Sequence, residues 1–311
     1  MLPALLSVNS RLLERSLGVA TLSQEVAARL ERRYPRTLHR HVPQHVSLPA
    51  GRSLLSRAEA RRALGYSDDD LLITVPGPAP SELEPLLRAV GRLGSEFPRL
   101  LLVVAGELDS QVSLATWADD SGVARVPVVT GRLSAEELVD HLVAADVVSA
   151  LRFPSRGEMP ATLIRALAVG RPVLVSAGTP AAAELPEGVV VPVNPGSRRL
   201  GELIALLRLL LGSATLRDAI GALARDHALA HHRLETAAAF LADFLVEVKE
   251  RRPELLPKIQ TETVVDGPIG GYFVDEMRFA ARGLGLAASS LGLETRLVRL
   301  AGQRMPVKGE R

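Results

Sequence analysis

Short apolar runs of strand length alternate with segments of helical periodicity along most of this chain. Residues 71–75 and 100–105 are continuous apolar runs, and residues 81–94 between them repeat their apolar side chains with a helical period. Fully apolar strands that alternate with helices are typical of a parallel sheet covered by helices on both faces. With right-handed crossovers, the pattern predicts an α/β fold with a Rossmann-like doubly wound parallel sheet over about residues 70–230.

The same pattern predicts the remaining elements. Ser134 and Glu137 form a capping-box sequence that opens one helix, Pro160 lies in the first turn of another, and Gly65 ends a short helix before the sheet. Further strands are expected at residues 126–129, 147–151, 172–176 and 189–193, with one more near 42–46. Helices are expected at 12–33 with a break at Gly18, and at 56–64, 134–145, 160–169, 199–211, 214–227, 233–250, 272–282 and 284–300.

The composition excludes several classes of protein. The 311 residues include no cysteine, which removes disulfides, thiolate metal sites and cysteine nucleophiles. Apolar stretches such as residues 100–106 and 203–211 are too short to span a membrane, so we expect no membrane span. Residues 1–10 have no basic region ahead of their apolar run, which argues against a secretory signal, and we expect a cytoplasmic protein.

Positive charge gathers at the beginning of the chain. Residues 1–62 hold 11 Arg and four Glu, a local net charge of +7 against +2 for the whole chain. Such a segment fits either a solvated helix surface or a face for an acidic partner, anionic lipid or nucleic acid. Aromatic residues make up only 3% of the chain and no nucleic-acid-binding motif occurs, so we expect no nucleic-acid partner.

Two histidine pairs have spacings that metal ligands also use. His227 and His231 lie four residues apart on an expected helix, with Glu235 continuing the same face, and His39 and His41 share one face of an extended segment. Polar surfaces produce both spacings as readily as metal sites do. We therefore interpret both pairs as solvated faces and expect no metal site.

One stretch combines the features of an anion-binding loop. Residues 151–176 read LRFPSRGEMPATLIRALAVGRPVLVS, in which a short turn leads from an expected strand into a helix that starts near Pro160. The free N–H groups and the dipole of such a helix N-terminus suit a phosphate, and Gly157 lets the main chain approach a ligand closely. Arg152 and Arg156 are either surface residues or the groups that neutralise a diphosphate by bidentate contact.

This stretch resembles the donor-site signature of the family-4 retaining glycosyltransferases, which have the two-domain GT-B fold. In that family, a Pro-Ser loop and a Glu precede a helix that carries a second Glu eight residues later, and Gly-x-Pro-Val-Val follows. The resemblance continues upstream in TGRLSAEELVDHLVAADVV at 130–148 and downstream in GTPAAAELPEGVVVPVNPGS at 178–197. It covers about half of the chain and implies a GT-B C-terminal, donor-binding domain.

The resemblance also implies a substrate and a set of site residues. The substrate would be a nucleotide sugar linked to UDP or GDP, with no required cofactor, because positive side chains take over the diphosphate charge. Glu158 and Arg156 would be catalytic, although Glu158 also suits a helix first turn without any ligand role. The donor-binding candidates are Gly77, Gly131, Arg132, Leu133, Arg152, Ser155, Gly157, Thr162 and Arg165; the family places the Gly-Arg loop, here residues 131–133, against the nucleotide base.

Three features depart from the family pattern. Active members have an Arg and a Lys in and after the loop of the first strand, where this chain has Ser81 near the Lys position and Glu82 and Glu84 beside it. Arg165 replaces the second Glu, a variant also found in bacterial members, and arginine cannot accept a hydrogen bond from a ribose hydroxyl. Residues 1–70 resemble only the last helix and connector of an N-terminal domain.

These features leave two hypotheses for the function. The chain is either a glycosyltransferase-like protein that needs a partner chain for the acceptor half, or a non-catalytic pseudo-glycosyltransferase that binds or scaffolds. We expect residues 1–70 to be a remnant of the N-terminal domain with its connector, and 71–250 to be the nucleotide-sugar-binding domain. The tail at 251–311 would carry short amphipathic helices. A protein partner or a second copy would dock through residues 1–62 and 253–311.

Overall fold

The computed structural model describes residues 10–258, with gaps at 47, 49–52, 78–79, 109–113, 153–154, 156 and 197–198. Internal contacts divide the chain into two compact units. One unit comprises Met1–Ala20, Ala28–Arg40 and Leu245–Arg311, and the other comprises Thr21–Ala27 and His41–Phe244. The second unit is the larger and contains the main sheet.

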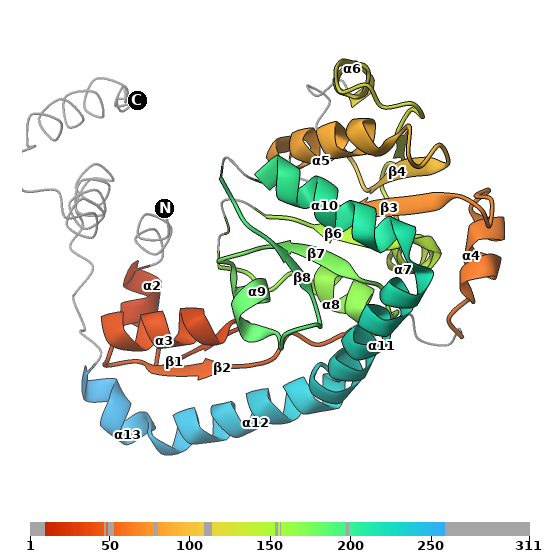
Figure 1. The fold of residues 1–311 in the computed structure, drawn as a ribbon. Helices are drawn as coiled ribbons and strands as arrows, with labels where there is room; N and C mark the ends of the chain where they lie inside the picture. Colours follow the sequence, from red (N-terminus) through yellow and green to blue (C-terminus); the bar gives the residue numbers. More distant parts are fainter. Residues whose placement is uncertain are drawn as a thin grey trace, which may run out of the picture. The chain divides into compact units, whose positions relative to one another are not determined.

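The larger unit is built on a six-stranded sheet with the strand order β5-β4-β3-β6-β7-β8 (Figure 1). Every neighbouring pair of strands is parallel. The strands are β3 (Leu71–Pro76), β4 (Leu100–Ala105), β5 (Val128–Val129), β6 (Val147–Ala150), β7 (Val173–Ser176) and β8 (Val191–Val193). The predicted doubly wound parallel sheet is therefore confirmed.

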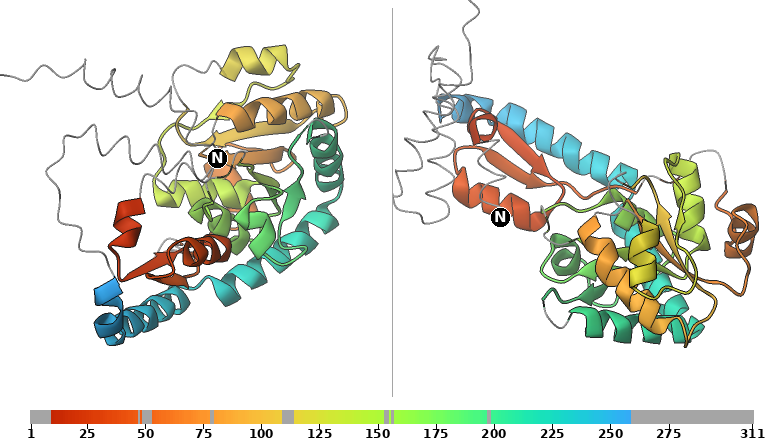
Figure 2. Two further views of the ribbon diagram at one scale, coloured as in Figure 1. Left: turned by 90° about the vertical axis from the view of Figure 1, so that its left-hand side faces the viewer. Right: turned by 90° about the horizontal axis from the view of Figure 1, so that it is seen from above.

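Helices cover both faces of this sheet. They are α4 (Arg57–Ala63), α5 (Pro80–Leu93), α6 (Leu114–Asp120), α7 (Ala135–Ala144), α8 (Ala161–Ala168), α9 (Pro180–Glu184), α10 (Arg199–Gly212) and α11 (Ala214–His231). The ribbon views show how these helices surround the sheet (Figure 1; Figure 2). Ile73 belongs to the core that includes residues of α5, α6 and α10, whereas its neighbour Leu72 belongs to the core that includes residues of α4, α7, α8 and α11. Successive side chains of β3 thus enter opposite cores, because strand side chains alternate between the two faces.

Two helices have a glycine at a point where another segment of main chain packs closely against them. A Cβ added at Gly91 of α5 would lie 1.9 Å from the Ser121 carbonyl oxygen, and one added at Gly221 of α11 would lie 2.2 Å from that of Gly170. Neither position has room for a side chain. These glycines let α5 and α11 lie directly on the neighbouring turns.

A buried carboxylate joins the amino-terminal ends of the central strands to two helices, α4 and α11. Asp146, just before β6, has a fully buried side chain and forms ion pairs with Arg57, Arg61 and Arg217. Its Oδ2 atom lies 2.6 Å from Arg61 Nη2 and accepts a hydrogen bond from the main-chain N–H of Leu72 at 2.8 Å. Both oxygens therefore have partners, as burial of a charge requires.

The terminal segments form a second, smaller set of elements. These are α2 (Ser10–Glu14), β1 (Gly18–Thr21), α3 (Gln24–Arg33), β2 (Leu38–His41), α12 (Leu234–Glu250), α13 (Arg252–Leu255) and the 3₁₀ helix η1 (Leu256–Lys258). β1 and β2 form a two-stranded sheet. Within the smaller unit, Leu38 N–H donates to the Leu17 carbonyl at 3.0 Å, and Arg40 pairs with Glu247 of α12.

The structure corrects two predicted elements. The helix expected at 12–33 is wrong over its middle, since β1 separates α2 from α3 and the β-branched Val19 and Thr21 lie in that strand. The strand expected near 42–46 is also wrong, because the strand lies earlier, at Leu38–His41. Helices α6 and α9 were not predicted. The helices expected at 272–282 and 284–300 lie outside the described residues.

Candidate functional site

The strand order creates a topological switch point between β3 and β6. The chain runs from β3 outward to β4 and β5, then returns to place β6 on the other side of β3. The connections leave these two neighbouring strands in opposite directions. Open α/β sheets bind ligands beyond the carboxyl ends of the strands at such a switch point.

Arg152 spans this switch point. It follows β6, and its Nη2 atom donates a hydrogen bond to the carbonyl oxygen of Gly77, directly after β3, at 3.3 Å. Its main-chain N–H donates to Ser176 Oγ, at the end of β7, at 2.9 Å. One residue therefore links the carboxyl ends of three adjacent strands, and its guanidinium lies at the switch point.

The loops after β3 and β4 pass closely by each other at the same edge. A Cβ added at Gly106 would lie 3.5 Å from both the N and the Cα of Gly77, and both glycines have a positive φ, +147° and +58°. Gly106 N–H also donates to Thr130 Oγ1, at the end of β5, at 3.1 Å. Main chain without side-chain cover therefore lines this part of the edge, which suits close approach of a ligand.

The loop from β6 to α8 brings main-chain donors to the edge. Ser155 Oγ accepts a hydrogen bond from Gly157 N–H at 3.0 Å, and Gly157 has a φ of +86°. Pro160 is the N-cap of α8 and makes no side-chain cap hydrogen bond. The first N–H groups of α8 therefore lack a side-chain cap, and an uncapped helix N-terminus attracts an anion.

The other residues proposed for this site differ in their setting. Glu158 and Arg132 are exposed, whereas Thr162 and Arg165 of α8 are half-buried. Gly131, with a φ of +71°, and half-buried Leu133 lie in the loop between β5 and α7. Arg156 lies outside the described residues. Near the β3 end of the site, Glu84 of α5 forms an ion pair with Arg88 at 3.0 Å.

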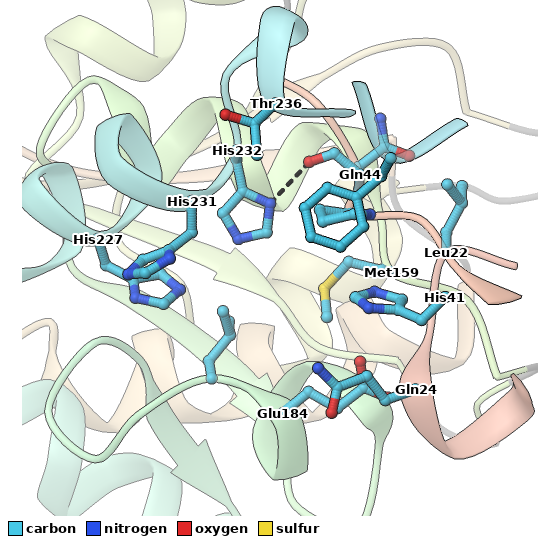
Figure 3. A pocket seen from close by; sticks show the side chains of 13 residues that line it. Leu22, Gln24, His41, Gln44, Met159, Glu184, His227, His231, His232 and Thr236 are labelled. Carbon is cyan, nitrogen blue, oxygen red and sulfur yellow. Dashed lines mark hydrogen bonds between the residues drawn. The ribbon is translucent and has the colours of Figure 1, made fainter. Parts of the chain in front are cut away.

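A separate pocket of about 290 Å³ lies within the larger unit, lined by histidines from two distant segments (Figure 3). His227 and His231 of α11 have ring centroids 4.7 Å apart, and the His232 ring lies 5.5 Å from that of His227. The lining residues are Leu22, Gln24, His41, Pro43, Gln44, Met159, Glu184, Leu185, His227, His231, His232, Thr236 and Phe240. Of the residues interpreted as solvated faces, His231 is indeed exposed, whereas His227 and His41 are half-buried, and all three line this pocket.

Two hydrogen bonds hold the connector after β2 against the end of α11. His232 Nδ1 lies 2.7 Å from the Gln44 carbonyl oxygen, and Val46 N–H donates to the His232 carbonyl at 2.6 Å. Because a carbonyl only accepts, Nδ1 of His232 carries the proton and Nε2 is left as an acceptor. The tautomer of His232 follows from this geometry.

Three of the four imidazoles in this pocket favour the neutral form. Burial lowers the pKa of His227 to about 4, and the neighbouring His231 and His232 contribute to the shift. Burial also lowers the pKa of His232, and it lowers that of His41 against an opposing effect of Glu184. At neutral pH these three rings are uncharged, and each has one donor and one acceptor nitrogen, of which the donor of His232 is already bonded to Gln44.

Glu184 adds the one carboxylate of the pocket lining. Its Oε1 atom accepts hydrogen bonds from the Ser23 hydroxyl at 2.6 Å and from Glu25 N–H at 3.0 Å. These contacts place a negative charge at the start of α3, where the helix dipole stabilises it. No sequence pattern marks Glu184 or His232 as site residues, because the pocket combines segments about 200 residues apart.

The described residues contain neither a cluster of metal ligands nor a membrane-spanning helix. No group of three or more His, Asp or Glu side chains among them is arranged to hold a metal ion. None of the helices described here combines the length and the apolar character that a membrane crossing needs.

Comparison with known proteins identifies the fold. No protein-family model and no curated protein matches the sequence. Among solved structures, sucrose-phosphate synthase from Thermosynechococcus elongatus is 22% identical, with a TM-score of 0.64 over 78% of this chain and 61% of that chain. WaaG, a glycosyltransferase of lipopolysaccharide biosynthesis, is 18% identical, with a TM-score of 0.59 over 71% of this chain and 60% of that one.

A third similar structure was solved with a ligand. HepE from Anabaena, in complex with UDP-glucose, is 15% identical, with a TM-score of 0.64 over 78% of this chain and 67% of that chain. These neighbours are GT-B glycosyltransferases, and the chain spans about 60% of the length of the first two. The Rossmann-like α/β fold predicted here is thus one that GT-B glycosyltransferases share.

Proposed function

We propose that this chain binds the diphosphate of a nucleotide sugar at the carboxyl edge of its sheet and acts as the donor half of a family-4-like, retaining glycosyltransferase. The hydrogen bond from Arg152 to Gly77 across the switch point supports this proposal most directly. It holds a guanidinium at the position where open α/β sheets bind ligands. Uncapped N–H groups at the start of α8 would add further donors for a phosphate.

The chemistry assigned to this edge is stabilisation of a leaving group. In the proposed transfer, the bond between the sugar anomeric carbon and the diphosphate oxygen breaks, and the electron pair leaves with the nucleoside diphosphate. A bond to the acceptor oxygen forms on the same face, and the acceptor proton passes to the departing phosphate. Arg152 and Arg156 would stabilise the negative charge that develops on that phosphate.

The acceptor half is proposed to come from a partner. The chain spans about 60% of the length of two of its glycosyltransferase neighbours. Transition-state stabilisation in a closed, water-excluding cleft needs both walls. Residues 1–62, with a net charge of +7, and residues 253–311 remain our predicted docking segments, and a cytoplasmic location remains a prediction.

The experiment for the proposed function is calorimetric titration of the full chain with UDP and, separately, GDP. We expect saturable binding of at least one nucleotide, and binding weaker by about tenfold to a hundredfold in Arg152→Gln, since a charge-assisted hydrogen bond to phosphate is worth about 1.5–3 kcal/mol. Arg208→Gln is the matched control, because this half-exposed arginine of α10 pairs with Glu96 instead. No heat with either nucleotide, or equal affinity in both variants, contradicts the proposal.

A non-catalytic role is the second candidate. Arg165, half-buried in α8, carries only donors and replaces a residue that would accept hydrogen bonds from ribose. The two candidates differ in turnover, because a binding module retains UDP affinity but releases no UDP from UDP-glucose with any acceptor or partner. Turnover that is lost in Arg152→Gln and kept in Arg208→Gln supports the transferase.

A further inference from the structure

The histidine-lined pocket lacks the chemistry of an anion site. Its lining contains four imidazoles, the Gln24 and Gln44 side chains, the Thr236 hydroxyl and the Glu184 carboxylate, but no lysine or arginine. Three of the imidazoles have a lowered pKa, so their rings are neutral at pH 7. A carboxylate among neutral groups repels phosphates and nucleotides.

The same groups match a ligand whose polar atoms both donate and accept. A neutral imidazole, an amide and the Thr236 hydroxyl each have both a donor and an acceptor, although His232 has only its Nε2 acceptor left for a ligand. Figure 3 shows His227 and His231 on one side of the pocket and His41, Gln24 and Glu184 on the other. A ligand in the pocket would therefore meet hydrogen-bonding groups from both sides.

Apolar side chains complete the lining. Leu22, Pro43, Met159, Leu185 and Phe240 contribute to it, and 45% of Phe240 is exposed. The combination of apolar surface with a few convergent polar groups is typical of small-molecule sites, and about 290 Å³ is close to the lower end of their volumes. A sugar ring has this dual character, with an apolar C–H face and a rim of hydroxyls.

We propose that the pocket binds a neutral carbohydrate, one sugar ring with its C–H face on Phe240 and its hydroxyls on the histidines, Gln24 and Glu184. Nucleotide binding by Arg152 is not required, since the pocket shares no residue with that site. The two sites can therefore succeed or fail separately. A metal ion is disfavoured, because no group of His, Asp or Glu among the described residues is arranged to hold one.

The test follows histidine side-chain NMR signals of the full chain at pH 7.5 during titration with D-glucose, D-galactose or D-mannose. We expect saturable shifts of the His227 and His231 ring signals with at least one sugar. His227→Phe keeps a ring but removes both hydrogen-bonding nitrogens, and should weaken binding about tenfold. His45→Phe is the matched control, since His45 lies next to Gln44 in the connector after β2 but does not line the pocket.

A second variant and two further probes make the result decisive. Gln24→Leu changes an exposed side chain, so it keeps the fold and should also weaken binding severalfold. Shifts that stay linear with every sugar, or that are equal in His227→Phe and His45→Phe, overturn the proposal. Shifts produced by inorganic phosphate or Zn²⁺ but by no sugar overturn it as well, and would assign the pocket to an anion or to a metal.

Discussion

Arg61 and Asp146 form an ion pair of 2.6 Å with both side chains almost entirely removed from solvent, at 2% and 0% exposure. The pair connects α4 to the residue that precedes β6, and Arg61 also donates to the carbonyl oxygens of Ala144 and Asp70. Loss of one partner from such a pair leaves an uncompensated buried charge. The resulting loss in the free energy of unfolding exceeds that caused by most single substitutions.

Asp146→Ala should therefore destabilise the fold by about 3–5 kcal/mol, because three arginines lose their shared carboxylate. Urea unfolding measures this change. Asp120→Ala is the control, since that residue is exposed on α6, and it should change the free energy of unfolding by less than about 0.5 kcal/mol. Equal midpoints for the two variants would contradict the account of this network.

Gly221→Ala should destabilise the larger unit by about 1–3 kcal/mol, because the new methyl group would lie 2.2 Å from the Gly170 carbonyl oxygen. Gly201→Ala in α10 provides the opposite case. No atom lies within 4 Å of the added Cβ there, so alanine should stabilise the helix by about 0.5–1 kcal/mol. Thermal unfolding of the two variants should show shifts of opposite sign.

Stability should fall on acidification in the range set by His227. Its pKa is about 4 in the folded chain against 6.5 for an unperturbed histidine, so the unfolded state binds more protons between these values. The contribution is fully present above pH 6.5 and is lost as pH falls toward 4. In His227→Gln, the free energy of unfolding should depend less on pH in this range. An unchanged slope would show that other groups cause the pH dependence.

Ser176→Ala should weaken nucleotide binding indirectly, through the position of Arg152. The variant removes the acceptor of the Arg152 main-chain N–H, at a cost of about 1–3 kcal/mol for the unpaired donor. Because Arg152 loses one of its two anchors, we expect a severalfold rise in the dissociation constant for UDP, measured by calorimetry. Ser134→Ala removes a helix cap of α7 and should lower stability by about 1 kcal/mol while leaving UDP affinity unchanged.

The main sheet could be predicted because its strands are continuous apolar runs. Residues 71–76 and 100–105 are buried on both faces, so their sequence carries a strong, local signal. The short strand Gly18–Thr21 has no such signal, since its residues are only half-buried and its partner is β2, some 20 residues later. Its apolar residues also fit the helical period of the flanking segments, which explains the wrong prediction there.

The two candidate sites also differ in how well they could be predicted from the sequence. The strand-to-helix loop at 151–160 and the carboxyl edge could be inferred from one stretch of sequence, because the order of elements determines which loops share an edge. The histidine pocket could not, because Gln24, His41, Glu184 and His227 meet only through tertiary packing. His227, His231 and His232 are close in sequence, but no periodicity relates them to His41, which lies about 190 residues earlier.

The pairing between β3 and β6 is the thinnest connection in the centre of the sheet. Only Ile73↔Val147 and Thr74↔Val148 are in register there, whereas β3 and β4 share six such pairs. The two halves of the sheet therefore share few register pairs where β3 meets β6. A molecule that binds at the carboxyl ends of β3 and β6 would contact both halves and stabilise their pairing, and slower amide exchange along β6 would report its binding.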